Sequence, residues 1–229
     1  TPLEELPFAG HPTIGAACLL ASKGLVPRGN EVCFTLEEGV GPVAVRVKHL
    51  PGDLPYAELT AAQEPRFSPA AAAGAIVETL GLSEDALGVG GPIVANCGLP
   101  MLLVPLRAPE LLAGVDTDFN RLPSLLKSCA AHSVYVYAQG YEGELRARMF
   151  SPGIGEDPAT GSAALALAAR LAADSAEAEI SLSWTVHQGE EMGRPSRLFI
   201  SADKSAGRIS ALRVGGYTVS VMEGHLNAP

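Results

Sequence analysis

The sequence predicts an α+β fold made of two pseudo-symmetric halves, each a set of strands wrapped around one central helix. The first observation is composition: the 229 residues include 25 Gly and 18 Pro in a chain that is 47% apolar, which favours short elements joined by many turns. The second is an internal similarity. Thr13-Ile14-Gly15-Ala16-Ala17 and Thr160-Gly161-Ser162-Ala163-Ala164 each open a run of small residues, and each follows an extended segment.

Two helices of small and apolar residues are predicted at the centres of these halves. The first begins at Pro12, because proline suits the first position of a helix, and ends before Gly24; we expect it to be buried. The second covers residues 163–173. Two further helices are expected, one from Ser68 to Leu80 with a cap residue and a first-turn proline, and one over residues 122–131.

Strands are predicted where apolar and polar residues alternate or where apolar residues follow one another. The clearest alternation lies within 41–48, where Val43, Val45 and Val47 are separated by Ala44 and Arg46. The other strands are expected at 31–36, 57–63, 101–106, 133–138, 146–150, 180–187, 197–202, 208–214 and 217–223. We expect an N-terminal half over residues 1–67, completed by residues 218–229, and a C-terminal half over residues 68–217.

Charge and composition argue against nucleic-acid and membrane partners. Lys and Arg number 16 against 25 Asp and Glu, so the net charge is −9 and a basic footprint is lacking. No run of 18 apolar residues occurs in the sequence. The cysteines form no CxxC pair, and each is expected to be a small buried residue in a reducing compartment (Cys18, Cys33, Cys97 and Cys129). We therefore expect a cytoplasmic protein.

The segments before the two small-residue helices predict a site for a small carboxylate. A helix N-terminus presents free N–H groups and the positive end of the helix dipole, so two such ends facing each other would attract an anion. Gly10, Gly161 and Ser162 would let backbone N–H groups approach it closely. His11 and Asp157 would then lie beside the ligand, where one could accept a proton and the other deliver one without a cofactor.

Structural roles for the same residues remain open at this point. Asp157 before Pro158, taken by itself, is typical of a turn or a helix cap, and His11 taken by itself is typical of a structural histidine. No metal site is expected, since the remaining histidines have no metal-ligand spacing (His49, His132, His187 and His225).

Three stretches resemble the PhzF-like family of phenazine biosynthesis. They are residues 5–13 (ELPFAGHPT), residues 153–163 (GIGEDPATGSA) and residues 188–196 (QGEEMGRPS), with Gly215-Gly216 before the last strand. The resemblance covers essentially the whole chain. It implies the diaminopimelate-epimerase-like fold, in which two pseudo-symmetric halves each place a helix inside a strand barrel, and this agrees with the internal similarity.

The resemblance also implies an activity. Members of the family are cofactor-free isomerases that move a proton within a small unsaturated cyclic amino acid, and they are commonly homodimers. By motif position, His11, Asp157 and Ser162 would be active-site residues, and Gly10, Gly161 and Ser162 would frame the substrate carboxylate. We therefore expect a small-molecule carboxylate substrate, no cofactor and a homodimer.

The N-terminal half departs from the family pattern. Family members carry further strands, a helix and the main catalytic glutamate before the Ala-Gly-His-Pro motif, so we expect the N-terminal half to be truncated. Leu82-Ser83-Glu84-Asp85 resembles the glutamate motif only superficially, and Glu84 is expected to be a surface residue.

Two alternatives follow from these features. A small-carboxylate-binding or interaction protein of the same fold is favoured by the missing glutamate segment. An amino-acid racemase or epimerase is disfavoured, because those enzymes use a cysteine in each loop, where this chain has Ala9 and Ala159.

Overall fold

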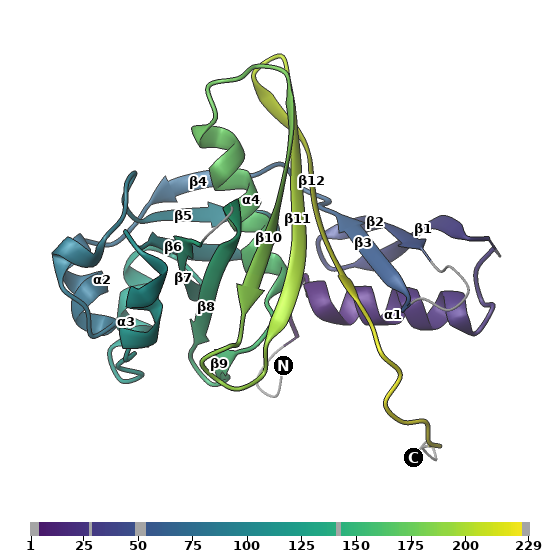
Figure 1. The fold of residues 1–229 in the computed structure, drawn as a ribbon, viewed down its shortest axis with the longest axis horizontal. Helices are drawn as coiled ribbons and strands as arrows, with labels where there is room; N and C mark the ends of the chain where they lie inside the picture. Colours follow the sequence, from purple (N-terminus) through teal and green to yellow (C-terminus); the bar gives the residue numbers. More distant parts are fainter. Residues whose placement is uncertain (1–4, 28, 49–53, 141–142, 226–229) are drawn as a thin grey trace.

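One continuous sheet organises the chain (Figure 1). The computed structural model describes residues 5–27, 29–48, 54–140 and 143–225. Within them, the strands follow the order β1-β2-β3-β12-β11-β10-β8-β7-β6-β5-β4 across the sheet, and β9 pairs with β8 outside this path. The β6–β7 and β8–β10 pairs are parallel and the other pairs are antiparallel.

The strands and helices have the following bounds. The strands are β1 (Glu31–Glu38), β2 (Gly41–Lys48), β3 (Tyr56–Thr60), β4 (Arg66–Pro69), β5 (Ile93–Asn96), β6 (Pro100–Pro105), β7 (Ser133–Gln139), β8 (Leu145–Ser151), β9 (Gly155–Asp157), β10 (Ile180–Gln188), β11 (Ser196–Ser205) and β12 (Arg208–Tyr217). The α-helices are α1 (Gly10–Ser22), α2 (Ala73–Thr79), α3 (Leu122–Ser128) and α4 (Gly161–Asp174), and the 3-10 helices are η1 (Glu84–Ala86) and η2 (Pro109–Gly114).

Helix α4 is the buried axis of the larger half. Every residue from Ala163 to Ala169 is fully buried, and the helix contacts β5, β6, β10, β11 and β12. A helix that is apolar on all sides belongs in a core, and its alanines let the surrounding strands approach closely. Arg170 is the charged exception; it is buried, but its guanidinium pairs with Asp174 at 2.7 Å and donates to the Gly90 carbonyl at 3.2 Å.

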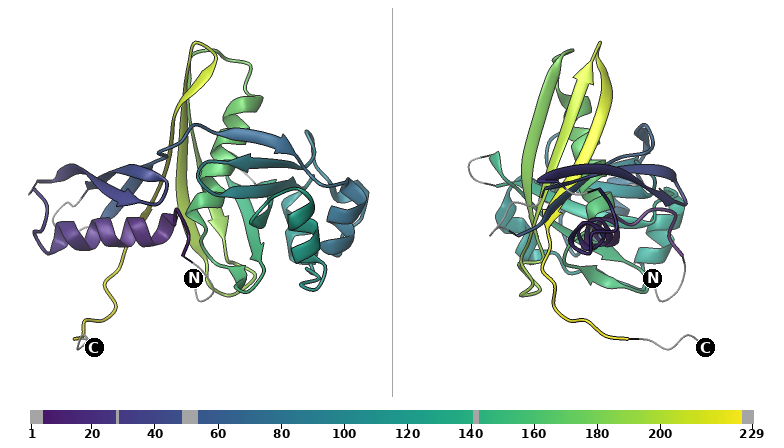
Figure 2. Two further views of the ribbon diagram at one scale, coloured as in Figure 1. Left: turned by 180° about the vertical axis from the view of Figure 1, so that it is seen from behind. Right: turned by 90° about the vertical axis from the view of Figure 1, so that its right-hand side faces the viewer.

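Helix α1 packs against the smaller half of the sheet but is not buried on all sides. It contacts β2, β3 and β12 through residues such as Ala17 and Cys18, whereas Ala16 is exposed and Leu19 is 54% exposed. The expectation of a buried helix is therefore wrong for this helix, because small and apolar residues all around it do not reveal which faces the strands cover. Figure 2 shows α1 under β1–β3, away from the end of the molecule that carries α2 and α3.

A second core lies under α2 and α3. The two helices cover the face of β5, β6, β7 and β8 turned away from α4, and they enclose a separate cluster of apolar side chains that includes Ile76, Leu80, Leu102, Leu122 and Phe150. Together with the cluster around α1 and α4, this completes the α+β fold with two helix-and-strand halves that the sequence predicts.

Four expectations need correction. Ser68 and Pro69 do not start a helix: they belong to β4, which pairs with β5, and α2 begins at Ala73. Residues 208–217 form one strand, and residues 218–225 extend from it without strand structure (Figure 2). Cys33 is exposed, unlike the other three cysteines. Helix α1 begins at Gly10, which makes Pro12 its third residue rather than its first.

The expected division into halves stays a prediction. Strand β4 spans the proposed boundary between residues 67 and 68, and β12 contacts both α1 and α4. Residues 1–4 and 226–229 of the proposed N-terminal half lie outside the described residues.

Candidate functional site

The N-termini of α1 and α4 meet at two glycines. A Cβ atom on Gly10 would lie 2.7 Å from the Gly161 Cα, and a Cβ on Gly161 would lie 2.9 Å from the Gly10 Cα. Both distances are too short for a carbon contact, and the atoms approached belong to backbone that cannot rotate away. Only glycine therefore permits this approach, and the two helix ends predicted to face each other do so.

Free N–H groups converge at this junction. The first N–H groups of a helix have no partner within it, and in α1 and α4 the first intrahelical bonds come from Thr13 and Ala164. The N–H groups of Gly10 and His11, and those of Gly161 and Ser162, therefore gather at one place, while Pro12 contributes none. Both helix dipoles add positive potential there, which suits a carboxylate.

A cleft of about 480 Å³ opens at the same junction. Its lining includes Gly10, His11, Ala159 and Gly161 from the two helix ends, and Gly215 and Gly216 from β12. The rest of its lining comes from other parts of the fold (Ile14, Leu54, Pro195, Ser196, Arg197, Leu198, Val214, Tyr217 and Thr218). Three of the five predicted site residues, Gly10, His11 and Gly161, thus lie together on this cleft.

The other two predicted residues lie beside the cleft rather than on its lining. Ser162 is 7% exposed, in the first turn of α4, and its N atom would be 3.3 Å from a Cβ on Gly10. Asp157 is half-buried at the end of β9, two residues before Ala159. His11 is exposed.

Asp157 is held in a network of polar side chains. Its Oδ2 accepts a hydrogen bond from the Thr160 hydroxyl at 2.6 Å, and its backbone carbonyl accepts one from Gln188 Nε2 at 2.7 Å. Gln188 Nε2 also donates to Thr160 Oγ1 at 2.9 Å, and its Oε1 accepts from the Tyr135 hydroxyl at 3.0 Å. Burial, and secondly the negative charge of Asp157, raise the pKa of Tyr135, so this phenol keeps its proton.

Thr160 and Gln188 are site residues to which the sequence analysis gave no role. Thr160 stands inside the second motif, and Gln188 opens the stretch at 188–196 that resembles the family. The sequence therefore marked both residues only as members of the stretches that resemble the family. Their contacts with Asp157 depend on β10 ending beside the start of α4, which sequence patterns do not reveal.

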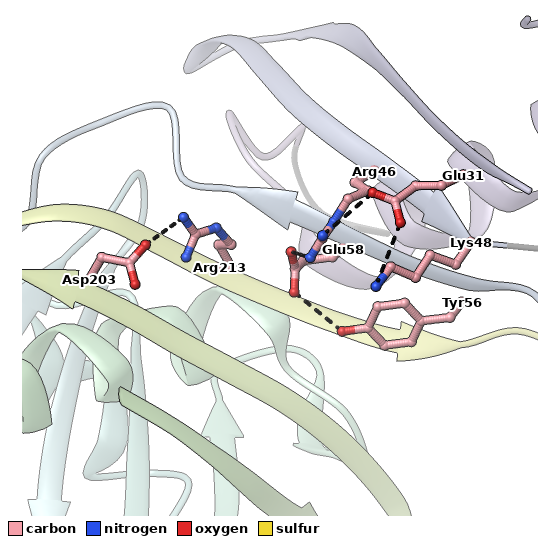
Figure 3. Close-up of polar contacts among 7 residues, drawn as sticks. All are labelled: Glu31, Arg46, Lys48, Tyr56, Glu58, Asp203 and Arg213. Carbon is pink, nitrogen blue, oxygen red and sulfur yellow. Dashed lines mark hydrogen bonds and ion pairs between the residues drawn. The ribbon is translucent and has the colours of Figure 1, made fainter. Parts of the chain in front are cut away.

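A larger hollow of about 740 Å³ lies next to the cleft and shares Leu54, Arg197 and Tyr217 with it. Three of the charged side chains that line it, Arg46, Lys48 and Glu58, are in ion pairs, as Figure 3 shows. Arg46 binds Glu58 at 2.6 Å and lies 3.6 Å from Glu31, which also pairs with Lys48 at 3.7 Å. Burial, and then the charge of Glu58, raise the pKa of Tyr56. We interpret this hollow as a surface of the sheet held by ion pairs between its strands, because it lacks the converging N–H groups of the smaller cleft.

Two kinds of feature are absent from the described residues. No helix among them is long and apolar enough to cross a membrane. Within the same residues, no three His, Cys, Asp or Glu side chains form a group that could hold a metal ion.

The fold of this chain is similar to that of solved proteins. The α+β fold is shared with solved PhzF-family and proline-racemase-like proteins. A PhzF-family protein of Bacillus anthracis superposes with a TM-score of 0.80 at 21% identity over 95% of this chain and 75% of that one. A hydroxyproline epimerase of Agrobacterium vitis superposes at 0.65 and 16% identity over 95% and 65%, which shows the fold alone.

The family follows from sequence. The model of the family described as phenazine biosynthesis-like protein (PhzC-PhzF) matches residues 1–224, so the chain belongs to the PhzF family. An uncharacterized isomerase of Mesorhizobium japonicum is 36% identical over 99% of this chain and 78% of its own length. The trans-2,3-dihydro-3-hydroxyanthranilate isomerase of Pseudomonas aeruginosa is 33% identical over 98% and 76%. A structure from P. aeruginosa described as a predicted epimerase superposes with a TM-score of 0.75 at 34% identity, over 95% of this chain and 73% of that one.

Proposed function

We propose that this protein is a cofactor-independent isomerase that shifts a proton within a small cyclic amino-acid-like substrate bearing a carboxylate. The observation that carries the proposal is the contact between the α1 and α4 N-termini at Gly10 and Gly161, beside a cleft of about 480 Å³. The two helix ends contribute backbone N–H donors to the site and no lysine or arginine side chain; Arg197 of β11 also lines the cleft. Membership of the PhzF family and relatives named isomerases support the reaction type.

In this proposal the two helix ends bind the carboxylate, and side chains around them move the proton. Backbone N–H groups at Gly10, Gly161 and Ser162 hold the anion, since they are fixed by the helices and need no reorganisation. Asp157 and His11 act as acid and base on the bound ring. The homodimer and the cytoplasmic location remain predictions from the resemblance and the composition.

A non-catalytic small-carboxylate-binding protein is the second candidate. One specific observation favours it: Asp157 and Ser162 are not among the residues that line the cleft in the described part of the chain. Binding without proton exchange would support this candidate over the first.

Proton exchange with solvent tests the proposed function. The protein is incubated in D2O with a panel of cyclic amino acids, both unsaturated and saturated, and deuterium uptake is measured by mass spectrometry. We expect uptake into at least one substrate, reduced at least about 100-fold by Asp157→Asn, since general acid–base catalysis contributes about 10²–10⁴-fold. Asp85→Asn, an exposed aspartate in η1, is the matched control and should leave the rate unchanged. Uptake that survives Asp157→Asn would remove Asp157 from the mechanism.

A further inference from the structure

Gln188 is a fully buried side chain whose polar atoms are all directed at the segment that carries Asp157. It ends β10, is 0% exposed, and uses both ends of its amide. Nε2 donates to the Asp157 carbonyl at 2.7 Å and to Thr160 Oγ1 at 2.9 Å. Oε1 accepts from the Tyr135 hydroxyl at 3.0 Å and from the Thr160 N–H at 3.3 Å. A buried amide with four such bonds has one orientation only.

The orientation of this amide determines which atom donates in the hydrogen bonds from Gln188 to Thr160 and from Thr160 to Asp157. A backbone N–H only donates, so the Gln188 atom facing the Thr160 N–H must be oxygen, and the atom facing Thr160 Oγ1 must be nitrogen. Thr160 Oγ1 therefore receives a hydrogen bond from Gln188. Its own proton is then directed to Asp157 Oδ2, 2.6 Å away.

The two oxygens of Asp157 are consequently unequal. Oδ2 is fixed by the Thr160 hydroxyl, whereas Oδ1 accepts no hydrogen bond from any described residue. The fixed oxygen sets the carboxylate plane, and the other oxygen keeps its lone pairs free of any described donor. The residues of this hydrogen-bond network, Tyr135, Thr160 and Gln188, come from β7, the start of α4 and the end of β10, so three elements define the orientation of one carboxylate.

We propose that Thr160 and Gln188 are positioning residues that orient Asp157 for proton transfer, with Gln188 fixing the donor direction of the Thr160 hydroxyl and Asp157 Oδ1 left to exchange the substrate proton. This inference rests on the proposed function of Asp157 as a proton-transfer residue. It assigns Thr160 and Gln188 no contact with the substrate.

Substitutions at Thr160 separate orientation from packing. Thr160→Val keeps the shape and removes the hydroxyl, whereas Thr160→Ser keeps the hydroxyl and removes a methyl group. We expect Thr160→Val to lower kcat for deuterium exchange about 10- to 100-fold, the size of effect that a displaced reacting group produces. KM should change less than about twofold, because the carboxylate-binding N–H groups are untouched. Thr160→Ser should restore kcat to near the wild-type value.

Gln188→Met provides a second variant in case Thr160→Val fails to fold. It keeps the approximate length of the side chain and removes the Nε2 donor without adding a charge, so Thr160 no longer receives its hydrogen bond from this position. The same loss of kcat with a steady KM is expected. A wild-type kcat in both Thr160→Val and Gln188→Met would overturn the proposal.

Crystal structures of the wild type, Thr160→Val and Thr160→Ser supply a readout that does not depend on activity. The proposal predicts a single Asp157 orientation in the wild type and in Thr160→Ser, and a rotated or divided carboxylate in Thr160→Val. An unchanged Asp157 in Thr160→Val would contradict it. If the carboxylate moves as expected but the wild type exchanges no substrate, the positioning role stands and the proposed isomerase activity fails.

Discussion

The backbones of Gly10 and Gly161 lie so close together that neither residue could carry a side chain without striking the other. Both were predicted as site residues because small residues at helix starts let N–H groups reach an anion, and the structure brings them together with His11 on one cleft. That part of the site could be predicted, since helix starts are marked locally by turn and cap residues. The Thr160–Gln188 contacts could not, because they join positions 28 residues apart through the packing of β10.

The glycine contact makes a prediction about stability. Gly161→Ala places a methyl group 2.9 Å from the Gly10 Cα, and overpacking of this kind costs about 1–3 kcal/mol. We expect a loss of that size in the free energy of unfolding, measured by urea denaturation. Gly15→Ala is the matched control in α1, where a Cβ would meet nothing within 4 Å; it should stabilise the protein by about 0.5–1 kcal/mol. Equal effects of the two substitutions would contradict the close approach.

Asp203 makes a prediction about acid stability. Hydrogen bonds from Arg213 at 2.6 Å and from Ser181 at 2.7 Å, in that order, lower the pKa of Asp203 below its ordinary value of 3.8 (Figure 3 shows the Arg213 pair). A carboxyl whose pKa is lower in the folded state adds stability above its unfolded pKa, and this contribution is lost as the pH falls through the folded pKa.

Asp203→Asn removes that contribution. We expect the variant to be less stable than the wild type at pH 7, and we expect the difference in the free energy of unfolding to shrink as the pH falls below about 4. Urea denaturation at a series of pH values measures it. A difference that stays constant down to pH 2 would show that the charge of Asp203 contributes nothing.

Among the elements, β9 is held by one buried ion pair. Arg148 in β8 binds both oxygens of Glu156, at 2.7 and 2.8 Å, and it also donates to the carbonyls of Leu112 and Val115 in and after η2. The two charged side chains are 10% and 18% exposed. Since Glu156 precedes Asp157, this pair fixes the strand from which the proposed acid–base residue projects.

Removing the arginine should therefore destabilise the protein. Arg148→Met leaves Glu156 and two carbonyls without their donor, and breaking a buried pair by removing one partner costs about 3–5 kcal/mol. We expect a somewhat smaller loss in the free energy of unfolding, about 2–4 kcal/mol, because Glu156 is partly exposed and can still reach water. Arg107→Ala, which removes an exposed partner of Asp85, is the control and should change the free energy of unfolding by less than about 1 kcal/mol. Similar losses in both variants would refute the special role of Arg148.

Element boundaries show where local sequence signals stop being sufficient. Ser68 and Pro69 carry a cap and a first-turn proline, which is a sound local signal for a helix, yet β4 uses both residues to pair with Val94 and Ile93 of β5. Pairing with residues of a strand 24 and 26 positions further along the chain outweighs that local preference. Similarly, Gly215 and Gly216 suggest a break between two strands, but both pair with β3 and the strand continues to Tyr217.

At the scale of the whole molecule, β12 joins the two halves. It pairs with β11 on one side and β3 on the other, contacts both α1 and α4, and contributes Gly215 and Gly216 to the cleft. The internal similarity of the two segments, residues 13–17 and 160–164, therefore corresponds to two helices whose N-termini meet beside a shared strand. The sequence predicted the two helices and their small-residue starts, whereas the continuous strand order that brings them together emerged only from the structure.

The central claim is that these two helix ends bind a substrate carboxylate. The most direct test is an NMR titration of the ¹⁵N-labelled protein with 3-hydroxyanthranilate, the aromatic counterpart of the substrate named for the P. aeruginosa relative, and with its uncharged carboxamide. The account predicts that the amide signals of Gly10, His11, Gly161 and Ser162 shift with the carboxylate and not with the carboxamide. Equal shifts with both compounds, or shifts confined to the larger hollow around Arg46 and Tyr56, would contradict it.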